Sequence, residues 1–171
     1  MALSFKRGRR ALMKNSLLLK TLVIVLLSLV LVSCTNPKQV INIDITAFMY
    51  GDEINQTVEV SMNGEYNTKE HSFVGSLVIG DVIKLEHVTF SPGSGLISYN
   101  ESTRSYLGQI FFDYKSLRFS IEITDQDLYQ QLTLSNHDGD KKITITSPAN
   151  NMEDAKRINA ELKDERLPFE K

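Results

Sequence analysis

Cysteine is almost absent from this sequence, because Cys34 is the only one among 171 residues. A disulfide within the chain is therefore excluded, and so is a metal site built from several thiolates. Tryptophan is missing altogether. A folded domain in this chain must be stabilised by its hydrophobic core rather than by covalent or metal cross-links.

Acidic residues are absent from the stretch before Cys34, which contains six basic ones. From Cys34 onward, 13 lysines and arginines stand against 21 aspartates and glutamates, so this part is clearly acidic although the whole chain has a formal net charge of only −2. An acidic surface repels phosphate backbones. We therefore expect no nucleic-acid partner.

A long hydrophobic run is also lacking. The uncharged apolar stretch between Lys20 and Cys34, TLVIVLLSLVLVS, has 13 residues. This length is typical of the apolar region of a signal peptide and falls short of the roughly 18 to 20 residues that a spanning helix needs. Basic residues before such a stretch hold it on the cytoplasmic side. We expect residues 1–33 to be a signal peptide, with general secretion favoured over the twin-arginine route that Arg9 and Arg10 loosely suggest.

The end of this stretch, Leu31-Val32-Ser33-Cys34, resembles the lipobox of bacterial lipoproteins. The resemblance implies that the Cys34 thiol receives a diacylglyceryl group and that cleavage follows between Ser33 and Cys34. Two acyl chains hold a protein on a membrane durably, where one does not. The implied location is the extracytoplasmic face of the cell membrane. The alternative is an ordinary membrane anchor or secretion signal with a chance cysteine.

After a short polar tether at residues 34–39, residues 40–171 are expected to form one β-rich domain. Apolar residues alternate with polar ones in Ile41-Asn42-Ile43-Asp44-Ile45 and in Phe119-Ser120-Ile121-Glu122-Ile123, which is typical of antiparallel sheets with one wet face. Such patterns predict a mainly β fold, an antiparallel sandwich or barrel of about eight strands. The expected strands are 40–48, 57–62, 72–79, 82–90, 96–99, 107–112, 117–123 and 142–146.

Turn-forming residues separate these segments. The segment 125–135 fits a loop or a short helix. The expected turns lie at Tyr50-Gly51-Asp52, Asn63-Gly64, Gly80-Asp81, Ser91-Pro92-Gly93-Ser94-Gly95 and Asp138-Gly139-Asp140.

Near the end of the chain the period changes from that of a strand to that of a helix. Pro148 ends the last strand, and Asn150 with Glu153 three residues later predicts a helix start. An apolar stripe follows, so we expect one amphipathic helix near residues 151–164. The stripe consists of Met152, Ala155, Ile158 and Leu162. The junction from Ser147 to Ala155 resembles that of small uncharacterised lipoproteins of Gram-positive bacteria, a resemblance that implies no activity.

No catalytic, metal or cofactor site is predicted. His71, His87 and His137 lack the spacing of metal ligands, and a hairpin turn explains Asp138-Gly139-Asp140 better than a calcium loop does. No G-x-S-x-G motif is present. Gly93-Ser94-Gly95 precedes a predicted strand rather than a helix, which favours a flexible loop over a phosphate cradle.

Aromatic residues gather between positions 99 and 119, where six occur. Because Phe111 and Phe112 are adjacent, they point to opposite sides of a strand. An exposed aromatic face binds glycans or proteins. The candidate binding surface consists of Tyr99, Tyr106, Phe111 and Tyr114. The favoured alternative is burial of these aromatics on both sides, under the terminal helix.

The sequence thus predicts a lipid-anchored, noncatalytic binding or interaction module of the cell envelope, with an envelope protein or glycan as its partner. An alternative from another class is an envelope enzyme with a carboxylate-based site acting on wall glycans or esters. A solute receptor is disfavoured, because the 138 residues from Cys34 onward are too few for two hinged lobes.

Overall fold

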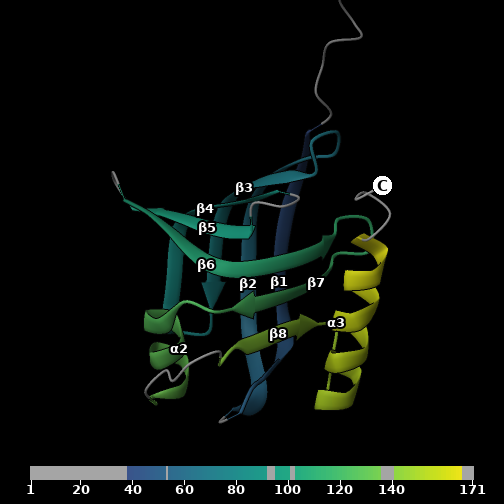
Figure 1. Cartoon of the computed structure of the whole chain (residues 1–171). Coiled ribbons are helices and arrows are strands. Elements are labelled where there is room, and N and C mark those ends of the chain that lie inside the picture. The colour runs from purple at the N-terminus through teal and green to yellow at the C-terminus, as the bar shows by residue number, and fades with distance from the viewer. Residues whose placement is uncertain (1–37, 53, 92–94, 101–102, 136–140, 167–171) are drawn as a thin grey trace, which may run out of the picture. The chain divides into compact units, whose positions relative to one another are not determined.

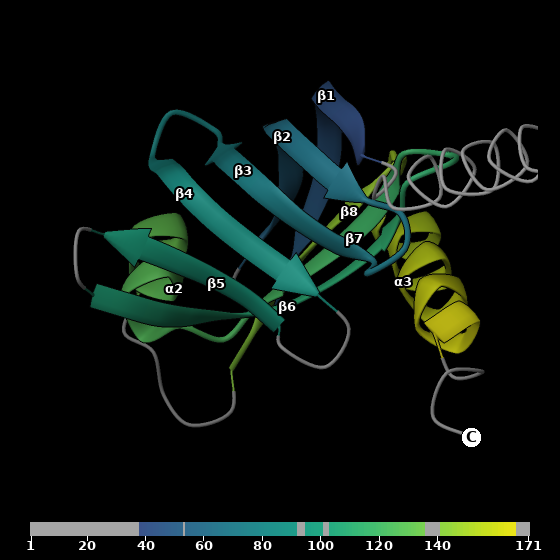
Figure 2. The same cartoon turned by 90° about the horizontal axis from the view of Figure 1, so that it is seen from above.

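The fold is an eight-stranded, closed antiparallel barrel flanked by two helices (Figures 1 and 2). The computed structural model describes residues 38–52, 54–91, 95–100, 103–135 and 141–166. Every strand pairs with its neighbours in sequence, and the eighth pairs with the first. The strands are β1 (Lys38–Tyr50), β2 (Asn55–Asn67), β3 (Ser72–Ile79), β4 (Ile83–Ser91), β5 (Gly95–Asn100), β6 (Thr103–Asp113), β7 (Arg118–Ile123) and β8 (Ile143–Ser147); the helices are α2 (Gln126–Thr133) and α3 (Met152–Arg166).

Closure of the barrel depends on the pairing of β1 with β8. Phe48 lies opposite Thr146, and Tyr50 lies opposite Thr144. These pairs join the last strand of the sheet to the first and so close it into a barrel. The predicted mainly β, antiparallel fold of about eight strands with a C-terminal helix is confirmed, and of the two architectures left open the barrel is the one that forms.

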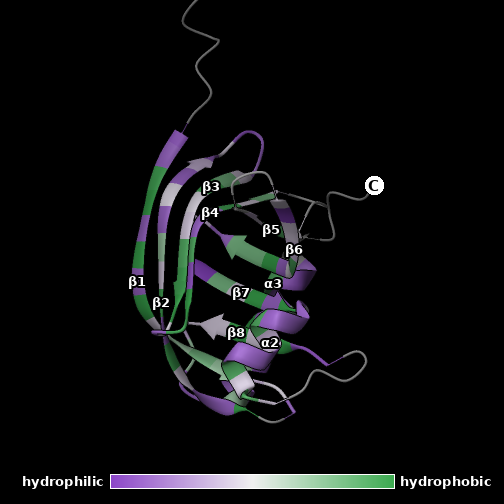
Figure 3. Cartoon of the chain, turned by 90° about the vertical axis from the view of Figure 1, so that its left-hand side faces the viewer, coloured by the Kyte–Doolittle hydropathy of each residue, from purple (hydrophilic) through white to green (hydrophobic). Residues whose placement is uncertain are grey.

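Apolar side chains at every second position of the strands fill the barrel interior. Ile41, Ile43, Ala47 and Met49 of β1 point inward and are at most 5% exposed, whereas Asn42 and Asp44 face outward. Hydrophilic and hydrophobic residues alternate along β1 in Figure 3. β1 begins two residues earlier than expected, so Lys38 and Gln39, assigned to the tether, belong to the barrel.

A turn was predicted at Asn63-Gly64, and this prediction is wrong. β2 continues to Asn67, and Gly64 lies directly opposite Gly75 of β3. A Cβ on either glycine would come within 2.8 Å of Cζ of Phe73, because the phenylalanine ring lies across the pair. The two glycines therefore make room for a large aromatic side chain in the core rather than for a change of chain direction.

Two other predicted turns are confirmed. Gly51 lies in a bend between β1 and β2. Gly80, between β3 and β4, has a φ of +56°, a conformation that glycine adopts without steric cost. Most of the predicted turn at 91–95 and all of the turn at 138–140 lie outside the described residues.

Aromatic side chains close one end of the barrel, which we call the aromatic end. Tyr66 stacks on Tyr114 with ring centroids 5.0 Å apart and meets Phe112 edge to face at 5.5 Å. Phe73 stacks on Phe90 at 4.9 Å. Burial, with smaller contributions from the neighbouring Tyr114 and Asp113, raises the pKa of Tyr66 to about 12. The first residue of β1 lies on this side of the barrel, where the turns from β2 to β3 and from β6 to β7 also lie (Figure 1).

The opposite end, which we call the helix end, is closed by α2. Leu128 and Tyr129 of this helix join the barrel core. Asp125 caps the helix, since its side chain accepts a 2.9 Å hydrogen bond from the backbone N–H of Leu128. Of the two structures that the segment 125–135 allowed, the short helix is the one that forms.

The C-terminal helix α3 packs on the outside of the barrel, along the right-hand side of Figure 1. Its predicted apolar stripe is confirmed, and three of the stripe's members are at most 5% exposed. The helix cap is Asn151 rather than Asn150, because the Asn151 Oδ1 accepts the 2.9 Å bond from the N–H of Asp154. The stripe packs in a second apolar cluster made of Phe48, Tyr50, Phe111, Ala149, Met152, Ala155, Ile158 and Leu162.

Candidate functional site

The four aromatic residues predicted as a binding surface do not form one surface. Phe111 is 7% exposed and packs in the apolar cluster beneath α3, whereas Phe112 packs against the barrel core. The prediction that these two point to opposite sides is confirmed. Tyr114 is half-buried against Tyr66 at the aromatic end. Phe111 is thus buried and Tyr114 is partly buried, in agreement with the alternative interpretation.

Tyr99 and Tyr106 remain exposed, at 43% and 51%. Tyr99 lies opposite Arg104, and Tyr106 lies opposite Ile97, which is only 4% exposed, so the exposed residues Tyr99, Arg104 and Tyr106 occupy neighbouring positions on the outer face of β5 and β6. We call this set the Tyr99–Tyr106 patch. A Cβ on Gly95 would lie 2.4 Å from Cε2 of Tyr106, which shows that the tyrosine ring covers this glycine.

A cluster of charged and polar side chains lies on the outer wall beneath α3, and Glu122 is at its centre. The Oε1 atom of Glu122 accepts hydrogen bonds from Lys163 Nζ at 2.5 Å, from Asn159 Nδ2 at 3.2 Å and from Lys142 Nζ at 3.2 Å. The side chain of Glu122 is only 8% exposed. A carboxylate so enclosed is stable only because its charge is compensated by partners.

The protonation of Glu122 follows from these contacts. Burial by itself raises the pKa of this carboxyl, but the hydrogen bonds from Lys163 and Asn159 and the positive charges of Lys163 and Lys142 outweigh it and lower the pKa below its ordinary value. Glu122 is therefore ionised at neutral pH. A general acid needs the opposite shift, so this carboxylate is arranged as an anchor for α3.

Further polar contacts extend from the same cluster. The Ser120 hydroxyl donates to Oδ1 of Asn159 at 2.9 Å and lies 3.0 Å from Oγ1 of Thr146. At the start of β7, Arg118 donates a hydrogen bond to Glu161 of α3 at 3.1 Å. Alternation assigned Ser120 and Glu122 to a wet face, and that assignment is wrong because α3 covers the outer side of β7 and β8. The amphipathic stripe indicated a helix but not the surface on which it packs.

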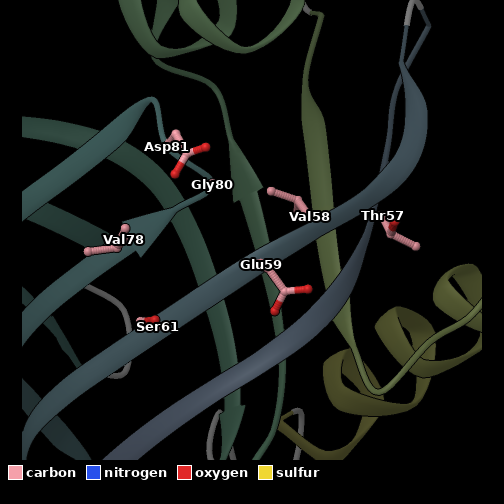
Figure 4. Close-up of a pocket in the computed structure, with 7 residues that line it drawn as sticks. All are labelled: Thr57, Val58, Glu59, Ser61, Val78, Gly80 and Asp81. Atoms are coloured by element: carbon pink, nitrogen blue, oxygen red, sulfur yellow. The ribbon is translucent and has the colours of Figure 1, made fainter.

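An open hollow lies on the outer wall at β2, β3 and the following turn, with a volume of about 470 Å³ (Figure 4). Two carboxylates, Glu59 and Asp81, contribute to its lining, and Oε1 of Glu59 accepts a 2.6 Å hydrogen bond from the Thr46 hydroxyl. No sequence pattern indicates this hollow, since its residues come from two strands and a turn. Its other lining residues are Thr57, Val58, Ser61, Val78 and Gly80.

The histidines do not converge. His71 lies in the turn between β2 and β3, with Nδ1 3.4 Å from the Tyr66 hydroxyl, and His87 is exposed on β4. His137 and the acidic turn at 138–140 lie outside the described residues. In the described part of the chain, no group of three or more histidine, cysteine, aspartate or glutamate side chains is placed to hold a metal ion.

Comparison of the chain with protein-family models, with curated proteins and with solved structures finds no match. Within the residues that the structure describes, no helix has both the length and the apolar character needed to cross a membrane. The predicted lipidation and cleavage residues, Cys34 and Ser33, lie outside this part of the chain.

Proposed function

We propose that this chain is a lipid-anchored lipoprotein of the cell envelope, held on the extracytoplasmic face of the cell membrane through Cys34. The observation that carries the proposal is the position of the only cysteine, which directly follows an uncharged run of 13 residues and completes Leu31-Val32-Ser33-Cys34. An apolar segment of this length is typical of a signal peptide, and two acyl chains on a cysteine suffice to attach a protein durably to a membrane.

The start of the barrel supports this proposal. β1 begins at Lys38, so only residues 35–37 separate Cys34 from the first strand. A closed barrel with a continuous core needs no disulfide, which suits an exported domain whose one thiol is used for the lipid.

We further propose that the barrel is a noncatalytic binding module and that the Tyr99–Tyr106 patch contacts its partner, an envelope protein or glycan. Tyrosine is enriched where proteins bind their partners, because it offers a large apolar ring together with a hydroxyl. Arg104 adds a planar charged group that stacks on aromatic faces and pairs with carboxylates. Tyr99 and Arg104 lie beside the turn between β5 and β6, and Tyr106 lies two positions further along β6.

Two measurements test the anchor and the patch separately. Membrane fractionation followed by intact-mass measurement is expected to find the mature protein in the membrane fraction, with diacylglyceryl mass on Cys34. Capture from envelopes with the wild-type protein is expected to retain a partner that a Tyr99→Ala/Tyr106→Ala variant loses. A matched Val82→Ala variant, which changes an exposed residue outside the patch, is expected to retain it. Equal retention by all three proteins would remove the patch from the proposal.

The alternative, an envelope enzyme acting on wall glycans or esters, draws on the hollow, because Glu59 and Asp81 line the same concavity. Glycoside hydrolysis uses two carboxylates that flank the scissile bond. Turnover of a wall glycan or ester that is abolished by Glu59→Gln or Asp81→Asn, in a variant that still folds, would favour this enzyme over the binding module.

A further inference from the structure

The distance between the proposed anchor and the barrel is short. Lys38 is the first residue of β1, and four residue steps join it to Cys34. Consecutive Cα atoms lie 3.8 Å apart, so these steps span at most about 15 Å. Whatever conformation the tether adopts, the start of β1 must stay within that distance of the lipid-bearing cysteine.

Exposed apolar side chains occur on the part of the barrel that this tether reaches. Val40 of β1 is 77% exposed and Val74 of β3 is 64% exposed. Glu65 of β2 lies between them and pairs with Val40 on one side and with Val74 on the other. They therefore form one outward row across β1, β2 and β3. Leu117, 40% exposed with a φ of +57°, lies in the turn between β6 and β7. The stacking of Tyr66 on Tyr114 places that turn at the same end as the end of β2.

The charges of the turns differ between the two ends. At the aromatic end, the turns after β2 and β6 contain the exposed residues Lys69, Glu70 and Lys115, which carry charges of both signs. At the helix end, the short turns after β1 and β3 contain Asp52 and Asp81, and Asp125 caps α2. Anionic head groups repel the acidic turns of the helix end, whereas the mixed charges of the aromatic end, with two lysines against one glutamate, do not oppose contact with them.

We propose that the aromatic end of the barrel lies against the surface of the bilayer. The contact consists of the turns at 68–71 and 114–117 together with the row of Val40 and Val74. The occupant of this surface is the lipid head-group region of the membrane that holds the acyl chains of Cys34. The helix end then faces away from the membrane. This inference rests on the proposed anchor and adds an orientation to it.

The single cysteine makes a direct test possible, since a thioether at Cys34 leaves an introduced cysteine as the only free thiol in the mature protein. Lys69→Cys and Leu117→Cys place a thiol in each turn of the aromatic end. Val82→Cys and Leu134→Cys are matched controls at exposed residues of the helix end, 56% and 91% exposed in the wild type. Each full-length variant is matured in cells, labelled with a fluorophore and reconstituted into vesicles of equal phosphatidylglycerol and phosphatidylethanolamine.

A lipid with a nitroxide on its head group then quenches fluorophores close to the bilayer surface. The orientation predicts several-fold stronger quenching at positions 69 and 117 than at 82 and 134. Equal quenching at all four positions, or stronger quenching at the helix end, would overturn the orientation while leaving the anchor intact. If Leu117→Cys disturbs its turn, Lys115→Cys replaces it as the label there.

Intact mass and flotation with the vesicles separate this failure from failure of the anchor. A protein that carries diacylglyceryl on Cys34 and floats with the vesicles retains the proposed function whatever the quenching. A protein that keeps a free Cys34 thiol and does not float overturns the anchor and, with it, the orientation.

Discussion

Lys163 of α3 and Glu122 of β7 are in direct contact, with 2.5 Å between Nζ and Oε1. The same ammonium group lies 5.2 Å from the centre of the Phe111 ring. One lysine therefore joins a buried carboxylate of the barrel wall to the apolar cluster under the helix. This contact fixes the position of α3 on the wall more specifically than its apolar stripe alone does.

Replacing Lys163 is expected to destabilise the protein. Lys163→Met removes the closest partner of Glu122 and leaves a buried carboxylate that Lys142 only partly compensates, which should lower the free energy of unfolding by about 2 kcal/mol. Urea denaturation measures this difference. Lys142→Met is the matched control, because its contact is longer, at 3.2 Å, and its side chain is 48% exposed. A loss for Lys142→Met as large as for Lys163→Met would contradict this ranking.

The stability of the fold is expected to depend on pH through Glu122. Its pKa is lower in the folded protein than the ordinary value of 4.5, so its contribution is complete above pH 4.5 and disappears as the pH falls through the folded pKa. Other carboxylates titrate in the same range, and the informative quantity is therefore the difference between wild type and Glu122→Gln. Denaturation at neutral pH and at stepwise lower pH should show this difference shrinking below pH 4.5. A difference that stays constant with pH would refute the role given to the ionised carboxylate.

The glycine pair inside the barrel is expected to tolerate no side chain. A Cβ on Gly75 would lie 2.2 Å from the carbonyl oxygen of Asn63 and 2.6 Å from Cζ of Phe73. Gly75→Ala must shift the backbone or the ring, and we expect a loss of about 2 to 3 kcal/mol in thermal or urea unfolding. Val74→Ala, at the exposed neighbouring position, should change stability by less than about 0.5 kcal/mol. An unchanged Gly75→Ala protein would mean that the ring does not occupy this space.

The Tyr99–Tyr106 patch predicts a loss of binding without a loss of stability. Both residues are about half exposed and lie outside the core, so Tyr99→Ala/Tyr106→Ala should unfold within about 1 kcal/mol of wild type. Once a partner is identified, calorimetry should show at least a tenfold weaker affinity, about 1.4 kcal/mol. A variant that unfolds much more easily, or that binds as tightly as wild type, would argue that the tyrosines are structural.

Much of this fold is predictable from the sequence, because one physical rule governs it. Period-two alternation identifies the inward residues wherever one face of a strand packs on the core and the other faces solvent, as at Ile41 and Ile43. The same rule misassigns Ser120 and Glu122, since a polar residue covered by a helix has the same pattern as one covered by water. Whether the sheet closes is not encoded locally, because the pairing of Phe48 with Thr146 joins residues nearly one hundred positions apart.

The remaining differences also have physical causes. Gly64 follows an asparagine, the usual sequence of a tight turn, yet its purpose here is to accommodate the Phe73 ring from the next strand. The aromatic residues between positions 99 and 119 do not lie together, because neighbouring residues of a strand alternate between its inner and outer faces. Some pack in the barrel core, and those on the outer face are either covered by α3 or exposed. Only the three-dimensional positions of α3 and the aromatic end distinguish Phe111 and Tyr114 from Tyr99 and Tyr106.

The proposed anchor and orientation both depend on a lipid at Cys34, which metabolic labelling with radioactive palmitate detects. Wild type and Cys34→Ser are expressed in bacteria with an active lipoprotein pathway and recovered by immunoprecipitation. We expect label in the wild-type protein and none in Cys34→Ser, which should also keep its leader. Absence of label from the wild type, or equal label in both proteins, would contradict it.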